Sequence, residues 1–237
     1  MIEIQHISKQ FGNLLVLKDV NLTCEHGQCI ALIGPNGCGK TTLIKCILGM
    51  VIPTSGTILF NQKKIARDFQ YRHNIGYMPQ QGRYPDNMTI GQVIDMIKDI
   101  RNTKNELDEQ LIESFRLGEI VDKKMRTLSG GTTQKVSASL AFLFDPDVLI
   151  LDEPTAGLDP LAAEIVKEKI ITENKKGKLV FITSHLLSEL DDLVTHVILM
   201  HEGGIRFHMP TAVLKEQTNT NSLAKAITYI LKRDHVQ

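Results

Sequence analysis

The stretch that decides the fold reads Gly34-Pro35-Asn36-Gly37-Cys38-Gly39-Lys40-Thr41-Thr42. The apolar residues 28–33 before it predict a buried strand, and residues 43–48 after it predict a helix. Its glycines let the backbone wrap closely around an anion, because positive φ angles cost a glycine little. The amide groups of the loop and the N-terminus of the helix would direct partial positive charge at phosphate oxygens. The pattern therefore predicts a phosphate-binding loop between a strand and a helix.

Two side chains of this stretch are candidate ligands of a nucleotide and its metal. The Lys40 ammonium would reach the β- and γ-phosphates, and the Thr41 hydroxyl would hold Mg²⁺. We therefore predict that the whole run from Gly34 to Thr42 binds ATP together with Mg²⁺.

A second element of the same site is predicted at residues 148–153. Val148-Leu149-Ile150-Leu151 is a continuous apolar run, which is typical of a parallel strand buried on both faces. Asp152 and Glu153 follow at its C-terminal end, where ligands bind in open α/β sheets. Asp152 is placed to hold Mg²⁺ through water, and Glu153 is placed to orient the attacking water or accept its proton. Taken alone, the pair could be an ordinary solvated turn.

Further motifs follow in the order that is typical of ATP-binding-cassette (ABC) ATPases, the motor subunits of ABC transporters. They are Phe11, the run Ile75-Gly76-Tyr77-Met78-Pro79-Gln80, the run Leu128-Ser129-Gly130-Gly131-Thr132-Thr133-Gln134-Lys135, the run Ala156-Gly157-Leu158-Asp159, and His185 after Ile182-Thr183-Ser184. On these motifs the chain resembles that family from residue 1 to about residue 217.

The resemblance implies a role for each motif. Phe11 matches the aromatic residue that stacks on adenine, and Gln80 matches the glutamine that senses the metal and the γ-phosphate. Ser129, Gly130 and Gly131 match the family signature, which binds the ATP held by a second subunit. His185 matches the switch histidine that contacts the γ-phosphate, and Ala156-Gly157-Leu158-Asp159 matches the loop that crosses the dimer interface. Glu153, His185 and Gln80 are therefore the expected catalytic residues, and Thr41, Gln80 and Asp152 are the expected metal ligands.

Each of these motifs also has a plainer interpretation. Phe11 before Gly12 could cap a hairpin, and His185 could be a surface histidine at the end of a strand. Gln81 could take the place of Gln80, although Gln80 directly follows Met78-Pro79. The run 129–131 could be a flexible turn before the apolar helix at 136–144. Its amides, however, open that helix and would form another anion-binding terminus.

One residue departs from the family pattern. The signature usually has glutamine after its two glycines, whereas this chain has Thr132 there. The backbone amides that contact phosphate do not depend on that side chain. We therefore expect Thr132 to alter affinity or turnover modestly and to leave the site active.

The order of the predicted elements indicates an α/β fold: a P-loop NTPase (RecA-like) core with an N-terminal antiparallel β region and a helical ABC-type subdomain. We predict one ABC ATPase domain at 1–217, with its core at 1–84 and 127–217 and the helical subdomain at 85–126. Apolar residues recur at helical spacing in that subdomain, in one group at Ile90, Val93, Ile94 and Ile97 and in a second from Leu107 to Phe115. Residues 218–237 are predicted to form a C-terminal helical tail.

Composition excludes several other classes. The counts of Lys+Arg and Asp+Glu are both 27, so the basic surface of a nucleic-acid-binding protein is not expected. Residues 1–4 begin directly as an amphipathic strand, which predicts no signal peptide, and no apolar run approaches the ~20 residues that span a bilayer. The four cysteines have no Cys-x-x-Cys spacing, so a metal site is not predicted from them.

The resemblance implies that two subunits dimerise head to tail, with Lys40 of one and Ser129 of the other on the same ATP. The expected partners are a second copy or a paired cassette and separately encoded membrane permease subunits, and the expected location is cytoplasmic, on the inner face of the cell membrane. A soluble ABC ATPase of translation or DNA repair is the alternative; such proteins generally have two cassettes or a coiled-coil insert, and basic arms. A nucleotide-binding regulator without turnover is disfavoured by Asp152, Glu153 and His185.

The sequence indicates the transported substrate much less directly than it indicates the ATPase. Leu158-Asp159-Pro160 is similar to the export-type group. Residues 77–89 and 140–146 resemble the copper-processing ATPase of the nitrous-oxide-reductase maturation system, with a multidrug, lipid or polysaccharide exporter as the alternative. Since a motor subunit does not bind the cargo, no residue of this chain identifies it directly.

Overall fold

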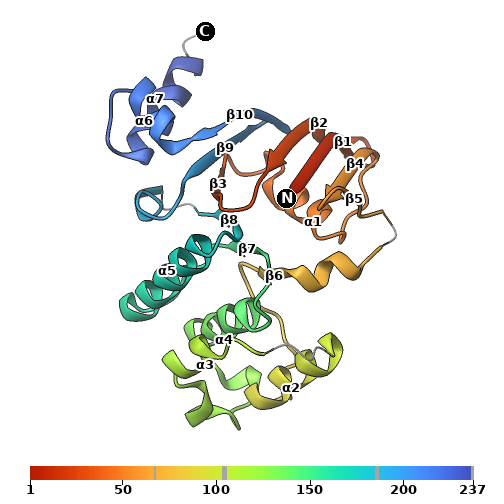
Figure 1. Ribbon diagram of the computed structural model, residues 1–237, viewed down its shortest axis with the longest axis vertical. Coiled ribbons are helices and arrows are strands. Elements are labelled where there is room, and N and C mark those ends of the chain that lie inside the picture. Colours follow the sequence, from red (N-terminus) through yellow and green to blue (C-terminus); the bar gives the residue numbers. More distant parts are fainter. Residues whose placement is uncertain (67, 103–105, 185–186, 236–237) are drawn as a thin grey trace. The chain divides into compact units, whose positions relative to one another are not determined.

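The computed structural model describes residues 1–66, 68–102, 106–184 and 187–235. The chain divides into two compact units, the first formed by Met1–Tyr71 with Leu179–Gln237 and the second by Arg72–Lys178 (Figure 1). The boundaries predicted from the sequence, with a helical subdomain at 85–126, follow the change in sequence character and stay a prediction.

The first unit contains two sheets and the helices packed against them (Figure 1). Its strands are β1 (Ile2–Phe11), β2 (Leu14–Cys24), β3 (Cys29–Ile33), β4 (Ser55–Phe60), β5 (Lys63–Lys64), β8 (Leu179–Thr183), β9 (His196–His201) and β10 (Gly204–Pro210). Its helices are α1 (Lys40–Ile47), α6 (Thr211–Gln217), α7 (Leu223–His235) and the 3₁₀ helix η4 (Leu187–Glu189), and the 3₁₀ helix η1 (Gln70–Asn74) runs across the boundary to the second unit.

The N-terminal sheet is antiparallel, as predicted. Its strand order is β2-β1-β4-β5, and β1 turns into β2 at Gly12-Asn13. Ile2, Ile4 and Ile7 of β1 are buried, whereas Gln5 and His6 between them are exposed. Alternation of side chains along a strand places Ile2 and Ile4 on the core face, and an irregularity in the pairing between Ile4 and Ile7 returns Ile7 to that face.

The second sheet carries the phosphate loop. Within the first unit its order is β10-β9-β3-β8, and β3 runs parallel to both β9 and β8. All five residues of β3 and all five of β8 are buried. A parallel strand covered on both faces needs such a continuous apolar run, so the strand predicted before Gly34 is confirmed.

The second unit is mostly helical (Figure 1). Its elements are β6 (Ile75–Met78), α2 (Ile90–Arg101), α3 (Gln110–Ser114), the 3₁₀ helices η2 (Leu117–Ile120) and η3 (Met125–Thr127), α4 (Gly130–Phe142), β7 (Val148–Asp152) and α5 (Pro160–Lys175). The strand predicted at 148–151 is present as β7, and it pairs in parallel with β6.

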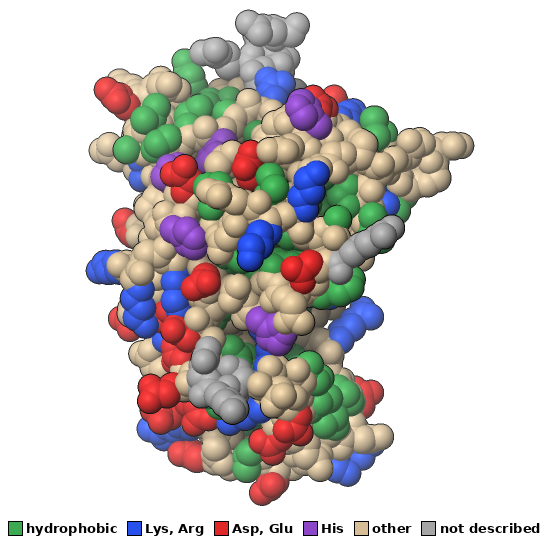
Figure 2. All heavy atoms as spheres, turned by 45° about the vertical axis from the view of Figure 1, so that its right-hand side comes forward, with side chains coloured by type: hydrophobic (Ala, Val, Ile, Leu, Met, Phe, Trp, Pro, Cys, Tyr) green, Lys and Arg blue, Asp and Glu red, His purple; other side chains and the backbone are tan. Residues whose placement is uncertain are grey.

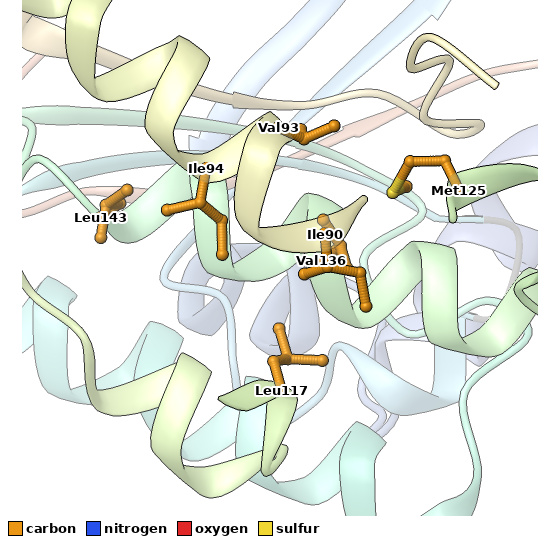
Figure 3. Close-up of a cluster of buried hydrophobic side chains, with 7 residues drawn as sticks. All are labelled: Ile90, Val93, Ile94, Leu117, Met125, Val136 and Leu143. Atoms are coloured by element: carbon orange, nitrogen blue, oxygen red, sulfur yellow. The ribbon is translucent and has the colours of Figure 1, made fainter. Parts of the chain in front are cut away.

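A cluster of apolar side chains holds the helices of the second unit together (Figure 3). It combines residues of α2, the two 3₁₀ helices and α4, namely Ile90, Val93, Ile94, Leu117, Met125, Val136 and Leu143. Of the predicted helical face, Ile90, Val93 and Ile94 are confirmed as members of the cluster, whereas Ile97 is only half-buried and lies outside it.

The helix predicted from Leu107 to Phe115 is shorter than its apolar spacing indicates. The helix α3 covers only Gln110–Ser114, so Leu107 lies outside it and Phe115 is its C-cap. Asp108 explains the late start: its backbone N–H donates to the Leu143 carbonyl and its carboxylate accepts from the Gln110 N–H. These bonds hold Asp108 outside the helix. The helix predicted at 136–144 also ends earlier, at Phe142.

The C-terminal helix predicted within residues 218–237 is present as α7. Leu223, Ala226 and Ile227 are buried, and the Asp191 carboxylate accepts the backbone N–H of Leu223 at the start of the helix. Among the described residues, no helix combines the length and the apolar character needed to cross a bilayer. On the face shown in Figure 2, acidic and basic side chains are interspersed.

A buried network of charges ties α3, the α4–β7 connection and α5 together in the second unit. Glu173 of α5, whose side chain is 1% exposed, pairs with the ammonium groups of Lys169 at 3.0 Å and Lys176 at 2.8 Å, and with Lys178. Lys169 also pairs with Asp108, and Lys178 with Asp145. Burial by itself raises the pKa of Glu173, but hydrogen bonds from the three lysines outweigh it and lower the pKa to about 2. Asp108, Asp145 and Glu173 thus form a carboxylate cluster that is neutralised by lysines.

We expect Glu173→Gln to destabilise the fold by about 3 kcal/mol at pH 7, because it removes the carboxylate that the buried ammonium groups of Lys169 and Lys178 share and leaves them only Asp108 and Asp145 as counter-charges. The depressed pKa of Glu173 stabilises the fold above its ordinary value of 4.5, and that stabilisation is lost as pH falls from 4.5 towards 2. The variant should lack this part of the acid dependence. Urea unfolding between pH 7 and pH 2.5 measures both effects.

The matched control is Glu164→Gln, which removes an exposed carboxylate of the same helix from its 3.9 Å pair with Lys167. Exposed pairs contribute about 0–1 kcal/mol, so little change is expected. Equal stability of Glu173→Gln and Glu164→Gln would contradict the role of the network.

Candidate nucleotide-binding site

The predicted phosphate loop connects β3 to α1 in the first unit. Gly37 and Gly39 have φ angles of 80° and 107°, and Gly39 is the N-cap of α1. The first turn of α1 has no acidic side chain, so nothing there opposes an anion at the helix N-terminus. The Lys40 ammonium donates to the carbonyls of Gly34 at 2.7 Å and Pro35 at 3.1 Å. It therefore lies over the concave side of its own loop.

Backbone contacts from two other elements fix the shape of this loop. The Gly203 N–H, in the β9–β10 turn, donates to the Cys38 carbonyl at 3.2 Å, and the Lys18 N–H of β2 donates to the Gly203 carbonyl at 2.9 Å. A Cβ on Gly34 would lie 2.3 Å from the Met200 carbonyl oxygen, and one on Gly203 would lie 2.6 Å from that of Val16. Only glycine permits such short separations, so the backbone of the phosphate loop is in direct contact with the backbones of β9 and of the β9–β10 turn.

The other predicted nucleotide residues of the first unit are accessible. Phe11 ends β1 and is 48% exposed, and the Lys9 ammonium lies 4.7 Å from the centre of its ring. Thr41 is exposed and Thr42 is half-buried in the first turn of α1. An aromatic face open to solvent can stack on a base, and a hydroxyl in this position can bind a metal.

In the second unit, the register of β6 and β7 brings three predicted residues to one sheet edge. The strands are parallel, with Met78 opposite Leu151. Gln80 follows the end of β6, and Asp152 and Glu153 lie at the end of β7, so all three are at the same carboxyl edge. Gln80 is exposed and Asp152 is half-buried. Burial raises the pKa of Tyr77 on β6, and the negative charge of Asp152 raises it further.

Glu153 has the most constrained backbone of these residues. It is 9% exposed and has a φ of 55°, which a non-glycine residue adopts only when its surroundings hold it there. Its carbonyl accepts hydrogen bonds from the Ala156 N–H at 3.1 Å and from the Gln134 side-chain amide at 3.3 Å. Strain of this kind is concentrated at functional sites, because it aims a side chain that regular structure would point elsewhere.

Ser129 starts α4 as its N-cap, and its hydroxyl accepts the Thr132 N–H at 3.2 Å. Ser129 and Gly130 are exposed, so this helix N-terminus is open to a ligand. The plainer interpretation of 129–131 as a flexible turn is therefore wrong for Gly130 and Gly131, which belong to a capped helix.

The site residues are divided between the units. Phe11 and the run from Gly34 to Thr42 belong to the first unit, and Gln80, Ser129, Gly130, Gly131, Asp152 and Glu153 belong to the second. His185 lies outside the described residues. Gly203 is a further residue of this site that the sequence patterns did not indicate. It lies in a Gly-Gly turn, and no local pattern links that turn to the phosphate loop.

A family model described as "ABC transporter" matches residues 17–156, which is more than half of the chain. The chain belongs to the ABC transporter family. It is an ATP-binding subunit with ATPase activity coupled to transport, as the motif order predicted.

Individual relatives agree with this assignment. The Nod factor export ATP-binding protein I of Burkholderia lata is 33% identical over 210 residues, which cover 85% of this chain and 68% of that protein. The lantibiotic transport ATP-binding protein SrtF of Streptococcus pyogenes is 31% identical, over 86% of this chain and 89% of that protein. A solved ATP-binding subunit of an ABC transporter has a TM-score of 0.90 at 27% identity, over 98% of this chain and 99% of that one. The predicted P-loop NTPase fold of the ABC type is therefore confirmed.

The signature of this ABC ATPase contacts the loop that follows β7 within the same unit. A Cβ on Gly131 would lie 2.8 Å from the Gly157 carbonyl oxygen. Asp159 caps α5 through the Ala162 N–H at 3.0 Å and pairs with Lys135 of α4 at 2.7 Å. The start of α4 and the loop 156–159 are thus packed together, and neither can move far without the other.

We expect Gly131→Ala to destabilise the nucleotide-free cassette by about 1–3 kcal/mol, because the added methyl overpacks this contact. The neighbouring Gly130→Ala is the control, since its Cβ would meet nothing within 4 Å. It should be neutral or slightly stabilising, because alanine favours a helix. Urea unfolding without nucleotide compares the two variants, and equal stability would mean that the signature does not pack on this loop.

Proposed function

We propose that this chain is the motor subunit of an exporter, and that two cassettes close head to tail around two Mg-ATP to drive a separately encoded permease. The strongest support is the family membership together with the complete phosphate loop at 34–42. The export direction is supported by two relatives, whose names describe Nod factor export and lantibiotic transport.

We assign the phosphates to the loop of the first unit. Its amides and the N-terminus of α1 would hold the β- and γ-phosphates, and Lys40 would exchange its carbonyl contacts for phosphate oxygens. Phe11 would stack on the adenine. Since phosphoryl transfer depends mainly on positioning and charge neutralisation, this cradle provides a large share of the catalytic effect.

The oxygen donors of the proposed metal site suit Mg²⁺. Thr41 offers a hydroxyl, Asp152 a carboxylate and Gln80 an amide carbonyl, and Mg²⁺ prefers such hard oxygen ligands together with water and phosphate oxygens. When bound, the ion neutralises charge on the β- and γ-phosphates. Thr41 and Asp152 would hold it, and Gln80 would report whether the γ-phosphate is present.

We assign the attacking water to Glu153. Its left-handed backbone is held by two hydrogen bonds to its carbonyl, which directs the side chain away from the path of β7. The carboxylate would orient the water or accept its proton. His185, which follows the run Ile182-Thr183-Ser184, would contact the γ-phosphate. The exposed Ser129 and Gly130 would meet the ATP held by the partner cassette.

We expect Glu153→Gln to bind ATP with the affinity of the wild type. Its rate of ATP hydrolysis should fall by about a hundredfold or more, because the proton acceptor is lost. ATP would then hold two cassettes together, so the variant should accumulate as a dimer. Size-exclusion chromatography with light scattering, in the presence of Mg-ATP, measures the dimer. Lys40→Ala is the control that should neither bind ATP nor dimerise. A monomeric Glu153→Gln with bound ATP would contradict the head-to-tail arrangement.

The permease would dock on the second unit. A cavity of about 510 Å³ is lined there by residues of the segment after Gln80 and of two helices, namely Gly82, Arg83, Tyr84, Pro85, Asp86, Met125 and Thr133. Tyr84 is fixed by a 2.9 Å hydrogen bond between its hydroxyl and that of Ser137. Because this cavity adjoins the metal-sensing Gln80 and the signature helix, a cytoplasmic helix seated in it would respond to ATP binding. The chain would accordingly lie on the inner face of the cell membrane.

We expect Arg83→Glu to reduce recovery of the permease severalfold when the tagged protein is purified from native membranes in mild detergent. The reversed charge would sit at the rim of the docking cavity, where Arg83 is exposed. Lys64→Glu, at an exposed site of the first unit, is the matched control and should retain the permease.

Mass spectrometry of the recovered proteins also tests the wider proposal. A polytopic membrane protein in near-equal amount supports a transporter, whereas ribosomal or DNA-repair proteins alone would support the soluble alternative. Copper or nitrous-oxide-reductase factors beside the permease would support the copper assignment, which stays a prediction from resemblance.

A further inference from the structure

Two helices of the second unit begin with related but different caps. At the start of α2, Thr89 and Gln92 form a reciprocal capping box: the Thr89 hydroxyl accepts the Gln92 N–H at 3.2 Å, and the Gln92 side chain accepts the Thr89 N–H at 2.9 Å. In such a box the long side chain at the third helical position satisfies the backbone donor of the cap residue. The hydroxyl of the cap residue keeps its proton free.

The start of α4 has the same spacing but a different residue at the third position. The Ser129 hydroxyl accepts the Thr132 N–H at 3.2 Å, as Thr89 does from Gln92. The Thr132 side chain, however, is bonded to the Ser129 side chain, with 2.9 Å between their hydroxyl oxygens. The Thr133 hydroxyl donates to the Ser129 carbonyl at 3.2 Å. Two threonines thus hold the signature serine where a glutamine would form a capping box.

The hydrogen-bond capacity of Ser129 decides what this bond can do. A hydroxyl has one proton to donate and two lone pairs that accept. The Thr132 N–H occupies one lone pair of the Ser129 oxygen, and a proton from the Thr132 hydroxyl would occupy the other. The Ser129 proton is then its only remaining hydrogen-bonding function, and it is free for an acceptor outside the helix. The β-branched side chain of Thr132 has few χ1 rotamers available in a helix, and the one it adopts places its hydroxyl 2.9 Å from that of Ser129.

We propose that Thr132 is a positioning residue for ATP hydrolysis: its hydroxyl donates to that of Ser129 and directs the Ser129 proton towards a phosphate oxygen of the ATP held by the partner cassette. The inference rests on the proposed head-to-tail function, which gives Ser129 its phosphate. A hydrogen bond accepted by Ser129 polarises its O–H and strengthens the bond that it donates. Thr132 therefore replaces the family's glutamine with a second hydroxyl that acts on the serine and not on the nucleotide.

The test is a set of substitutions at one position, assayed by steady-state ATPase kinetics on the full chain. Thr132→Val keeps the shape and removes the hydroxyl, so the ATP concentration at half-maximal rate should rise about three- to tenfold, as expected for one neutral hydrogen bond. Thr132→Ser keeps the hydroxyl and should restore most of the wild-type value. Binding of a fluorescent ATP analogue to the single cassette should be unchanged in all three proteins, because the phosphate loop is untouched.

A double-mutant cycle with Ser129→Ala separates this inference from the proposed function. Once Ser129 has lost its hydroxyl, Thr132→Val should have no further effect on the half-maximal ATP concentration. If Ser129→Ala alone has wild-type kinetics, the signature role fails and the inference fails with it. If Ser129→Ala is impaired but Thr132→Val is wild-type, or the two effects are additive, only the role of Thr132 is overturned. Melting temperatures of the variants identify any loss that comes from unfolding.

Discussion

The phosphate loop depends on a contact among three backbones that leaves no room for side chains. The loop after β3, the first half of β2 and the β9–β10 turn meet through the hydrogen bonds of Cys38, Lys18 and Gly203. Gly34 lies against the carbonyl of Met200 so closely that a methyl group would overlap it. The antiparallel sheet and the mixed sheet of the first unit therefore support the loop jointly. A phosphate group would meet a cradle whose shape is already set, which lowers the reorganisation needed for binding.

The second unit positions its functional residues by other means. Parallel pairing of β6 with β7 places Gln80 and Asp152 at one edge, and helix caps at Ser129 and Asp159 order the segments beside them. The buried charges around Glu173 connect the segment before α3 to α5 and so stabilise the arrangement of these helices. Such a network demands good geometry, since a buried charge without its partner costs several kcal/mol. It therefore favours one arrangement of the helices over alternatives.

The division of the site between two units agrees with the chemistry of an ABC ATPase. In the proposed function, the first unit would offer the phosphate cradle, and the second would offer the metal carboxylate, Glu153 and the signature. Catalysis of phosphoryl transfer requires all of these groups to be in place at once. In the proposed dimer, turnover would therefore depend on closure of the two cassettes, and this dependence would couple hydrolysis to transport.

Local patterns in the sequence were sufficient for the strand before Gly34 and the strand before Asp152, because each is decided by neighbouring residues. The roles expected of Phe11, Gln80 and His185 came from resemblance to the family and stay predictions. Tertiary structure alone decided the contact of Gly203 with the phosphate loop, the late start of α3 at Gln110 and the lysine network around Glu173. Each of these features includes a contact between residues that are far apart in the chain, such as Gly203 with Cys38, Asp108 with Leu143 and Lys169 with Asp108. No local pattern records such contacts. The pairing of the Thr132 and Ser129 hydroxyls is local in sequence, but side-chain rotamers decide it and only the folded helix displays them.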